Sequence, residues 1–182
     1  MFNIFTSINQ DFINKIFNQT LKLEDGTFQQ GQKIGNIIRD SKVCWIHDMD
    51  LRKEALYATN FIMRKNDFFF NLDTIEPLQY TEYEKDGQYG WHQDTFKPKG
   101  NYSKLWQGRI RKISFSIFLN DDFTGGEFDL EYQGPECKKR YKTFKKQGHN
   151  NIVFFPSYLY HRVRPVQSGV RKSLVGWILG PP

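Results

Sequence analysis

Residues 111–120 read Arg-Lys-Ile-Ser-Phe-Ser-Ile-Phe-Leu-Asn, and apolar side chains occupy every second position through most of this stretch. Successive side chains of a β-strand point to opposite faces. One face would carry Ile113, Phe115, Ile117 and Leu119, and the other Lys112, Ser114, Ser116 and Phe118. The alternation predicts a β-strand with one uniformly apolar face.

Further short apolar or alternating segments surround this strand, and turn pairs such as Asp86-Gly87, Gly125-Gly126 and Ser168-Gly169 separate several of them. We expect strands at residues 68–72, 78–83, 89–94, 127–132, 151–155, 161–166 and 170–179. Many short strands at fairly regular spacing indicate a mainly β fold, a sandwich or a barrel.

The N-terminal third has helical periodicity instead. Residues 7–18 predict a helix with Ser7 as its cap, and residues 51–65 predict a second helix capped by Asp50. We therefore expect one domain over residues 1–182, in which 1–66 form mostly helical support and 67–182 form the β core.

Composition is compatible with a globular domain. Hydrophobic residues make up 38% and aromatic residues 16% of the chain, enough for a sizeable core and too much for disorder. No stretch approaches the roughly 18 apolar residues that a membrane span needs. The N-terminus lacks the pattern of a signal peptide, and Cys44 and Cys137 fit free thiols, so we expect a cytoplasmic protein without membrane contact.

The net charge of +6 is concentrated in two runs of basic residues. The first contains Lys97, Lys99, Lys104, Arg109, Arg111 and Lys112, and the second Lys138, Lys139, Arg140, Lys142, Lys145 and Lys146. Solvated loops are one interpretation, and a surface for an acidic peptide, another anion or nucleic acid is the other. No nucleic-acid-binding motif accompanies the runs, which disfavours nucleic acid as a partner.

Three separated side chains have the chemistry of a metal site. His92 and Asp94 are two residues apart, as same-face neighbours on a strand would be, and His161 lies far downstream. Two histidines and one carboxylate form the facial triad typical of non-haem Fe(II) oxygenases. Arg171 follows, and a guanidinium pairs well with the carboxylate of a cosubstrate. The other histidines, His47 and His149, are expected to be solvent-exposed or structural.

Further motifs surround these residues in a fixed order. They are Tyr83-x3-Gly87-Gln-Tyr89-x2-His92-x-Asp94, the strand at 111–120, Gly125-Gly126-Glu127, Val153-Phe-Phe-Pro156-Ser157, His161-x-Val163-x-Pro165-Val166 and Gly169-x-Arg171-x-Ser173-Leu-Val-x-Trp177. Residues 78–179 thereby resemble the Fe(II)- and 2-oxoglutarate-dependent dioxygenases, specifically the prolyl/lysyl hydroxylase-type group. The resemblance implies a double-stranded β-helix, or jelly roll, buttressed by N-terminal helices.

The resemblance also implies roles for individual residues. His92, Asp94 and His161 would bind Fe(II), and Arg171 would bind the distal carboxylate of 2-oxoglutarate, assisted by Tyr83 and Ser173. Ser116 and Trp177 would face the same cosubstrate. The implied reaction consumes O2, converts 2-oxoglutarate to succinate and hydroxylates a substrate, with ascorbate as a candidate reductant.

The substrate class stays open at this level. A prolyl or other residue of a peptide or protein is the first hypothesis, and a free amino acid or other small molecule is the second. A non-catalytic metal-binding β-barrel is a third, although it would not need Arg171. Related halogenases lack the carboxylate of Asp94, and related nucleic-acid dealkylases carry arginine where this chain has Trp177. The loop 95–110 is the expected substrate loop, together with the region before residue 83. The oligomeric state is not predicted.

Overall fold

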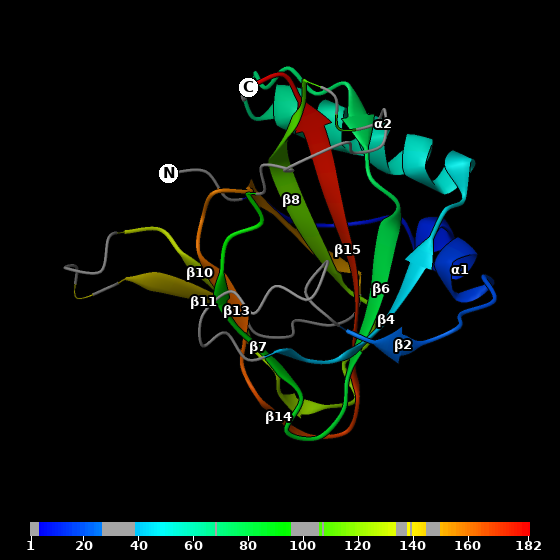
Figure 1. Ribbon diagram of the computed structural model, residues 1–182, viewed down its shortest axis with the longest axis vertical. Coiled ribbons are helices and arrows are strands. Elements are labelled where there is room, and N and C mark those ends of the chain that lie inside the picture. Colours follow the sequence, from blue (N-terminus) through cyan, green and yellow to red (C-terminus); the bar gives the residue numbers. More distant parts are fainter. Residues whose placement is uncertain are drawn as a thin grey trace.

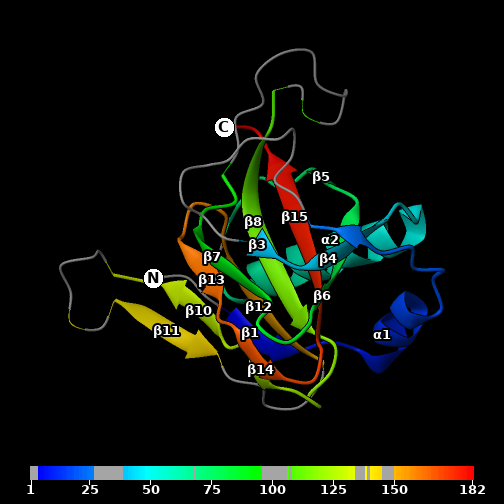
Figure 2. The same ribbon diagram turned by 60° about the horizontal axis from the view of Figure 1, so that its bottom comes forward.

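Two facing β-sheets and two helices form the fold in the computed structural model, which describes residues 4–26, 39–67, 69–95, 106, 108–133, 138, 140–144 and 150–182. Figure 1 shows the helices on one side of the larger sheet and the smaller sheet on its other side. Figure 2, turned by 60°, shows the same three layers.

The larger sheet contains eight strands among the described residues, in the order β1-β12-β8-β15-β6-β4-β2, with β5 beside β15. Their bounds are β1 Ile4–Ser7, β12 Asn151–Pro156, β8 Ile110–Phe118, β15 Arg171–Gly180, β6 Leu78–Tyr83, β4 Lys42–Ile46, β2 Glu24–Asp25 and β5 Thr74–Ile75. All of these pairings are antiparallel. β8 and β15 lie at its centre, which is why they have the longest alternating patterns.

The smaller sheet contains five strands, in the order β11-β10-β13-β7-β3. They are β11 Tyr141–Phe144, β10 Phe128–Glu131, β13 His161–Val163, β7 Gln88–His92 and β3 Arg39–Asp40. A separate pair joins β14 (Val166–Ser168) to β9 (Thr124–Gly125). Two facing antiparallel sheets with two covering helices confirm the expected jelly-roll architecture.

The helices are α1 (Gln10–Phe17) and α2 (Met49–Lys65), close to the predicted ranges. The predicted caps were wrong. Ser7 belongs to β1, and Asn9 caps α1 by accepting from the Asp11 N–H at 2.9 Å. Asp48 rather than Asp50 caps α2. The segment 1–66 also contributes β1 to β4 in addition to its helices.

The core has two parts because β8 and β15 bury both of their faces. Apolar side chains on one face meet the buried sides of the helices, among them Phe12, Ile16, Leu51, Met63, Ile113, Phe115, Ile117, Leu174 and Ile178. Between the sheets, Phe118 packs with Tyr83, Phe128, Leu130, Phe155 and Val163. The alternation predicted for residues 111–120 is confirmed.

Two predicted strands differ from the structure. Residues 69–72 form no strand. Phe70 and Leu72 pack on the core with their side chains while Phe69 stays 84% exposed, and pairing with β15 begins only at Thr74. The predicted strand 161–166 is divided into β13 and β14, with Pro165, which lacks a ladder N–H, between them. No helix in the described residues is long and apolar enough to cross a bilayer.

Gly176 offers a test of the packing on the face of the larger sheet that the helices cover. A Cβ at this position would lie 2.3 Å from the ring of Phe115, which is itself 1% exposed. We expect Gly176→Ala to lower the free energy of unfolding by about 1–3 kcal/mol through overpacking. Urea denaturation measures this change.

The matched variant is Gly176→Ala combined with Phe115→Leu, which gives the new methyl group room. The double variant should lose less stability than the sum of the two single losses. Additive losses would show that the ring of Phe115 does not limit the space at position 176.

Candidate metal and cosubstrate site

The two candidate histidines lie opposite each other on paired strands. His92 ends β7, His161 begins β13, and the two residues are direct partners in the antiparallel register. The register then shifts, so that Val163 pairs with Tyr89. This bulge brings Tyr89 onto the same side as His92, where the two rings stack with centroids 3.5 Å apart. Simple alternation along a strand would have placed Tyr89 and His92 on opposite faces.

Asp94 completes the cluster from the segment just after β7. Its backbone N–H donates to the Ser157 carbonyl at 2.9 Å, which holds the segment against the end of β12. Asp94 Oδ1 lies 3.7 Å from His92 Nε2, and Oδ2 lies 3.5 Å from His161 Nε2. One ligand atom from each residue falls within 4.8 Å of the others, so the three side chains could hold a single metal ion.

The hydrogen bonds of the imidazoles leave the correct atoms available for a metal. His92 Nδ1 lies 2.8 Å from the Gly90 carbonyl, and His161 Nδ1 lies 3.0 Å from the Leu159 carbonyl. An Nδ1–H that donates to a carbonyl leaves Nε2 as a lone-pair ligand. Burial, aided by His161, lowers the pKa of His92 to about 3, so its imidazole is in the neutral, metal-binding form.

The carboxylate of Asp94 lacks a partner on one of its oxygens. The residue is 7% exposed, and Oδ2 is buried without a hydrogen bond from the described residues. Burial alone would raise the pKa of Asp94, but His161, His92 and Arg111 hold it below its ordinary value. A buried, unsatisfied carboxylate oxygen beside two imidazole Nε2 atoms is the donor set that a divalent iron ion prefers, so the residues fit the metal.

Arg171 is a buried cation at the start of β15, 1% exposed. Its Nε donates to the Gly126 carbonyl and its Nη1 to Ser173 Oγ, both at 2.9 Å. Within the part of the chain that the structure describes, Nη2 is buried without a hydrogen-bond partner and no carboxylate forms an ion pair with Arg171. Burial lowers the pKa of Arg171. A buried guanidinium without an anion is costly, so this arrangement calls for an anionic ligand.

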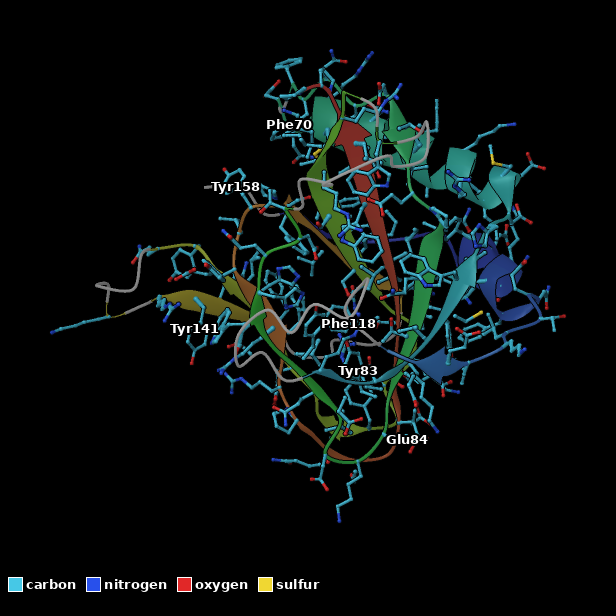
Figure 3. The ribbon with its side chains drawn as sticks, in the orientation of Figure 1. Phe70, Tyr83, Glu84, Phe118, Tyr141 and Tyr158 are labelled. Carbon is cyan, nitrogen blue, oxygen red and sulfur yellow. The ribbon has the colours of Figure 1, made fainter. Side chains whose placement is uncertain are left out.

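The predicted site residues line one cavity of about 160 Å³ between the two sheets. Its walls include His92, Asp94, His161, Arg171, Tyr83, Ser116, Ser173 and Trp177. Figure 3 labels Tyr83, which lines this cavity, and Phe118, which packs with Tyr83 between the sheets. The guanidinium of Arg171 lies 5.4 Å and 5.2 Å from their ring centroids. The structure thus brings all the predicted residues together, while His47 is exposed outside the cavity and His149 lies outside the described residues.

Arg111 was wrongly grouped with the surface charges of the first basic run. Its guanidinium is buried, forms a two-point ion pair with Glu76 at 2.6 Å and 2.7 Å, and lies 4.1 Å from the ring centroid of Trp177. Its Nη1 also reaches the Asp94 carbonyl at 3.4 Å. The indole Nε1 of Trp177 is buried and has no hydrogen-bond partner among the described residues, so it is a donor available to a ligand at this end of the cavity.

Sequence reasoning missed several other residues of the cavity wall, among them Arg39, Trp45, Gln79 and Tyr89. The alternation of residues 78–83 contained the signal for Gln79, because it shares a face with Tyr83. Arg39 and Trp45 come from a segment that was expected to be helical support, and their strands pair with β7 and β6. Only the strand pairing reveals that they reach the cavity.

The two basic runs are only partly described. Lys97, Lys99 and Lys104 of the expected substrate loop, and Lys139, Lys145 and Lys146, lie outside the described residues. In the second run, Arg140 pairs with Glu131 at 2.6 Å and Lys142 lies 4.9 Å from the ring centroid of Phe144. These two cations therefore have structural contacts within the smaller sheet.

Comparison with known families agrees with this geometry. The model of the 2OG-Fe(II) oxygenase superfamily matches residues 78–179, more than half of the chain. The chain belongs to this superfamily. Members use Fe(II), 2-oxoglutarate and O2, and the matched segment contains the triad, Arg171 and most of the cavity wall.

Similar proteins narrow the group within the superfamily. A PKHD-type hydroxylase of Gloeothece citriformis is 33% identical over 130 residues, which cover 70% of this chain and 50% of that protein. The chain thus spans about half the length of the curated relatives it matches most strongly.

Two solved structures share the fold. A prolyl-4-hydroxylase of Pseudomonas putida superposes with a TM-score of 0.64 at 17% identity, covering 97% of this chain and 91% of that one. A prolyl hydroxylase of Trichoplax adhaerens, in complex with a hypoxia-inducible-factor peptide fragment, gives 0.60 at 15% identity, with 96% and 82% coverage. The prolyl hydroxylase-like jelly roll therefore extends over almost the whole chain.

Metal binding should depend on the charge of Asp94. Loss of a residue that only hydrogen-bonds to a metal ligand commonly weakens metal binding 10–100-fold. Asp94 would be a ligand itself, so Asp94→Asn should weaken Mn(II) or Co(II) binding by more than ~100-fold. The metal-free variant should stay folded, because the substitution removes an unsatisfied buried charge. Calorimetric titration with Co(II) and thermal unfolding without metal measure the two effects.

Gln93→Ala is the matched control, because Gln93 lies between the two ligands in sequence and bonds through its side chain to the Tyr158 carbonyl. It should keep metal affinity within a few-fold of the wild type. Wild-type Co(II) affinity in Asp94→Asn would remove this carboxylate from the metal site.

Proposed function

We propose that this protein hydroxylates a prolyl or other residue of a peptide or protein, using Fe(II), O2 and 2-oxoglutarate. The observation that carries the proposal is the pairing, in one cavity, of a His-Asp-His cluster with a fully buried arginine whose described neighbours supply no anion. A metal site alone would not require Arg171, whereas a dicarboxylate cosubstrate would.

The cosubstrate fits between Arg171 and the triad. Nη2 of Arg171 and the hydroxyl of Ser173 would bind the carboxylate remote from the metal, over the ring of Tyr83. Gly126 leaves room for the guanidinium, because a Cβ at this residue would lie 2.9 Å from Arg171 Cδ. The small side chain of Ser116 on the neighbouring strand keeps the same wall open.

Bound Fe(II) supplies the oxidising chemistry, in which 2-oxoglutarate and O2 yield succinate and CO2 while one oxygen atom enters a substrate C–H bond. The chain's own task is to hold the ligands and exclude water. Phe128, Phe155 and Val163 line the cavity beside His161 and present apolar walls there. Such walls keep bulk solvent from the reacting atoms.

Trp177 would serve the substrate rather than 2-oxoglutarate. It lies six residues from Arg171 on β15, which corresponds to about 20 Å along a strand. A five-carbon dicarboxylate anchored at Arg171 does not span that distance. The unused indole N–H, beside the Arg111–Glu76 pair, fits an acceptor such as a peptide carbonyl. The peptide-bound fold relative supports a peptide substrate as the first candidate.

Cosubstrate affinity should depend on Arg171 while metal affinity does not. Arg171→Ala should raise the 2-oxoglutarate concentration needed for half-maximal succinate formation, with a loss on the order of 2–4 kcal/mol. Arg171→Lys should be intermediate, since lysine lacks the two-point fork. Co(II) titration of the same variants should match the wild type. Unchanged 2-oxoglutarate dependence in Arg171→Ala would exclude this arginine from cosubstrate binding.

Substrate affinity should depend on the indole N–H of Trp177. Trp177→Phe keeps an aromatic ring against Arg111 but deletes the donor. We expect the KM for a peptide substrate to rise by about 5–30-fold, which corresponds to the loss of one hydrogen bond. The rate of 2-oxoglutarate consumption without peptide should be unchanged. A rise in the 2-oxoglutarate requirement instead would place Trp177 at the cosubstrate.

Substrate identity is tested by incubating the Fe(II)-loaded protein and 2-oxoglutarate with proline-containing peptides and with free amino acids. Succinate formation with a gain of one oxygen atom on a peptide supports the proposal. Oxygen gain on free amino acids alone would overturn the peptide assignment. Absence of 2-oxoglutarate binding would point to a non-catalytic metal-binding barrel.

A further inference from the structure

Helix α2 exposes large apolar side chains on the face that points away from the sheets. Tyr57 is 76%, Phe61 59% and Met49 55% exposed, although the opposite face of α2 buries Leu51, Ala55, Thr59 and Met63. Figures 1 and 2 show that this helix lies on the side of the larger sheet remote from β7 and β13. The face is therefore separate from the metal and cosubstrate site.

The exposed face has a regular arrangement around Tyr57. At 3.6 residues per turn, positions seven apart lie within about 20° of the same line along a helix. Asp50 lies seven residues before Tyr57 and Arg64 seven residues after it, so the three form one line. Lys53 and Phe61 lie four residues to either side of Tyr57, next to that line. Asp50 and Arg64 are thus equally distant from Tyr57 along the helix. Lys53 and Phe61 form a second pair at equal distances from it.

We propose that α2 is the interface of a homodimer, in which two copies pack antiparallel about a two-fold axis at Tyr57. In this arrangement Tyr57 meets its own copy, and Asp50 of each chain meets Arg64 of the other. Lys53 of each chain lies over the ring of Phe61 of the other. A two-fold interface must be self-complementary in this manner, because the same surface faces itself.

The charges needed for the interface are available. The side chain of Asp50 is 97% exposed, and its one ion pair among the described residues is a 3.7 Å contact with Lys53. Arg64 is also exposed. A second copy of the chain is favoured over an acidic or a basic partner. An acidic partner would complement only Arg64, and a basic partner only Asp50. An antiparallel copy of α2 complements both charges, because it places its own Arg64 at Asp50 and its own Asp50 at Arg64.

Apolar surface beside α2 extends the area that a dimer could bury. A groove lined by Ile8, Phe12, Ala58, Phe61 and Ile62 runs along the helix, with Glu54 and Lys65 also in its wall. Stable interfaces bury about 800 Å² per partner, more than one helical stripe provides. The groove supplies the additional apolar surface next to Phe61.

Charge exchange tests the proposed pairing in the whole 182-residue chain. Sedimentation equilibrium of the wild type at low salt should give a monomer–dimer equilibrium. Asp50→Arg alone and Arg64→Asp alone should each weaken dimerisation by at least about tenfold, because two symmetric attractions become repulsions. The double variant Asp50→Arg/Arg64→Asp should restore it. An equimolar mixture of the two single variants should form a heterodimer, since both of its charge pairs are attractive.

Cross-linking locates the axis independently of charge. In a Cys137→Ser background, Tyr57→Cys should form an intermolecular disulfide on mild oxidation. Lys65→Cys is the control, because its two copies would lie about 24 Å apart. A wild type that sediments as a monomer at every concentration would overturn the proposal. A dimer that ignores both charge reversals, or that cross-links equally at both positions, would place the interface elsewhere.

Discussion

The antiparallel pairing of β7 with β13 is the interaction on which the rest of the site depends. It places His92 directly opposite His161, and the adjacent bulge adds the ring of Tyr89 to the same side. The outer face of these strands holds the register. Arg162, next to His161, donates to the fully buried Asp129 at 2.7 Å and lies 4.7 Å from the ring centroid of Trp91, which is next to His92. Neighbours of both His92 and His161 are therefore joined behind the candidate metal site.

Three buried polar atoms without hydrogen-bond partners among the described residues lie around the cavity, namely Asp94 Oδ2, Arg171 Nη2 and Trp177 Nε1. Such atoms cost stability when nothing satisfies them. They occur at three different places along the wall, as expected for a metal, a dicarboxylate and a substrate acceptor in turn. Ligands that satisfy these groups would stabilise the folded protein by mass action. The incomplete polar contacts are thus best understood as parts of binding sites.

The central strands β8 and β15 separate this polar cavity from the apolar support. Ser116 and Ser173 face the cavity, whereas Phe115 and Leu174 on the opposite face pack under α1 and α2. The helices bury the outer side of the sheet and leave the cavity side free for chemistry. This division explains why the outer face of α2, far from the metal site, is available for another copy of the chain.

The sequence by itself determined the mainly β class, the two helices, the inner and outer faces of β8 and β15, and the His92, Asp94, His161 and Arg171 set. These features depend on local periodicity and on residue chemistry, which a single chain displays directly. Only the tertiary structure decided the bulge that turns Tyr89 toward His92, the burial of Arg111 against Glu76, and the arrival of Arg39 and Trp45 at the cavity. Each of these depends on pairing between segments distant in the chain, and neither the composition nor the spacing of one segment records which partner it will meet.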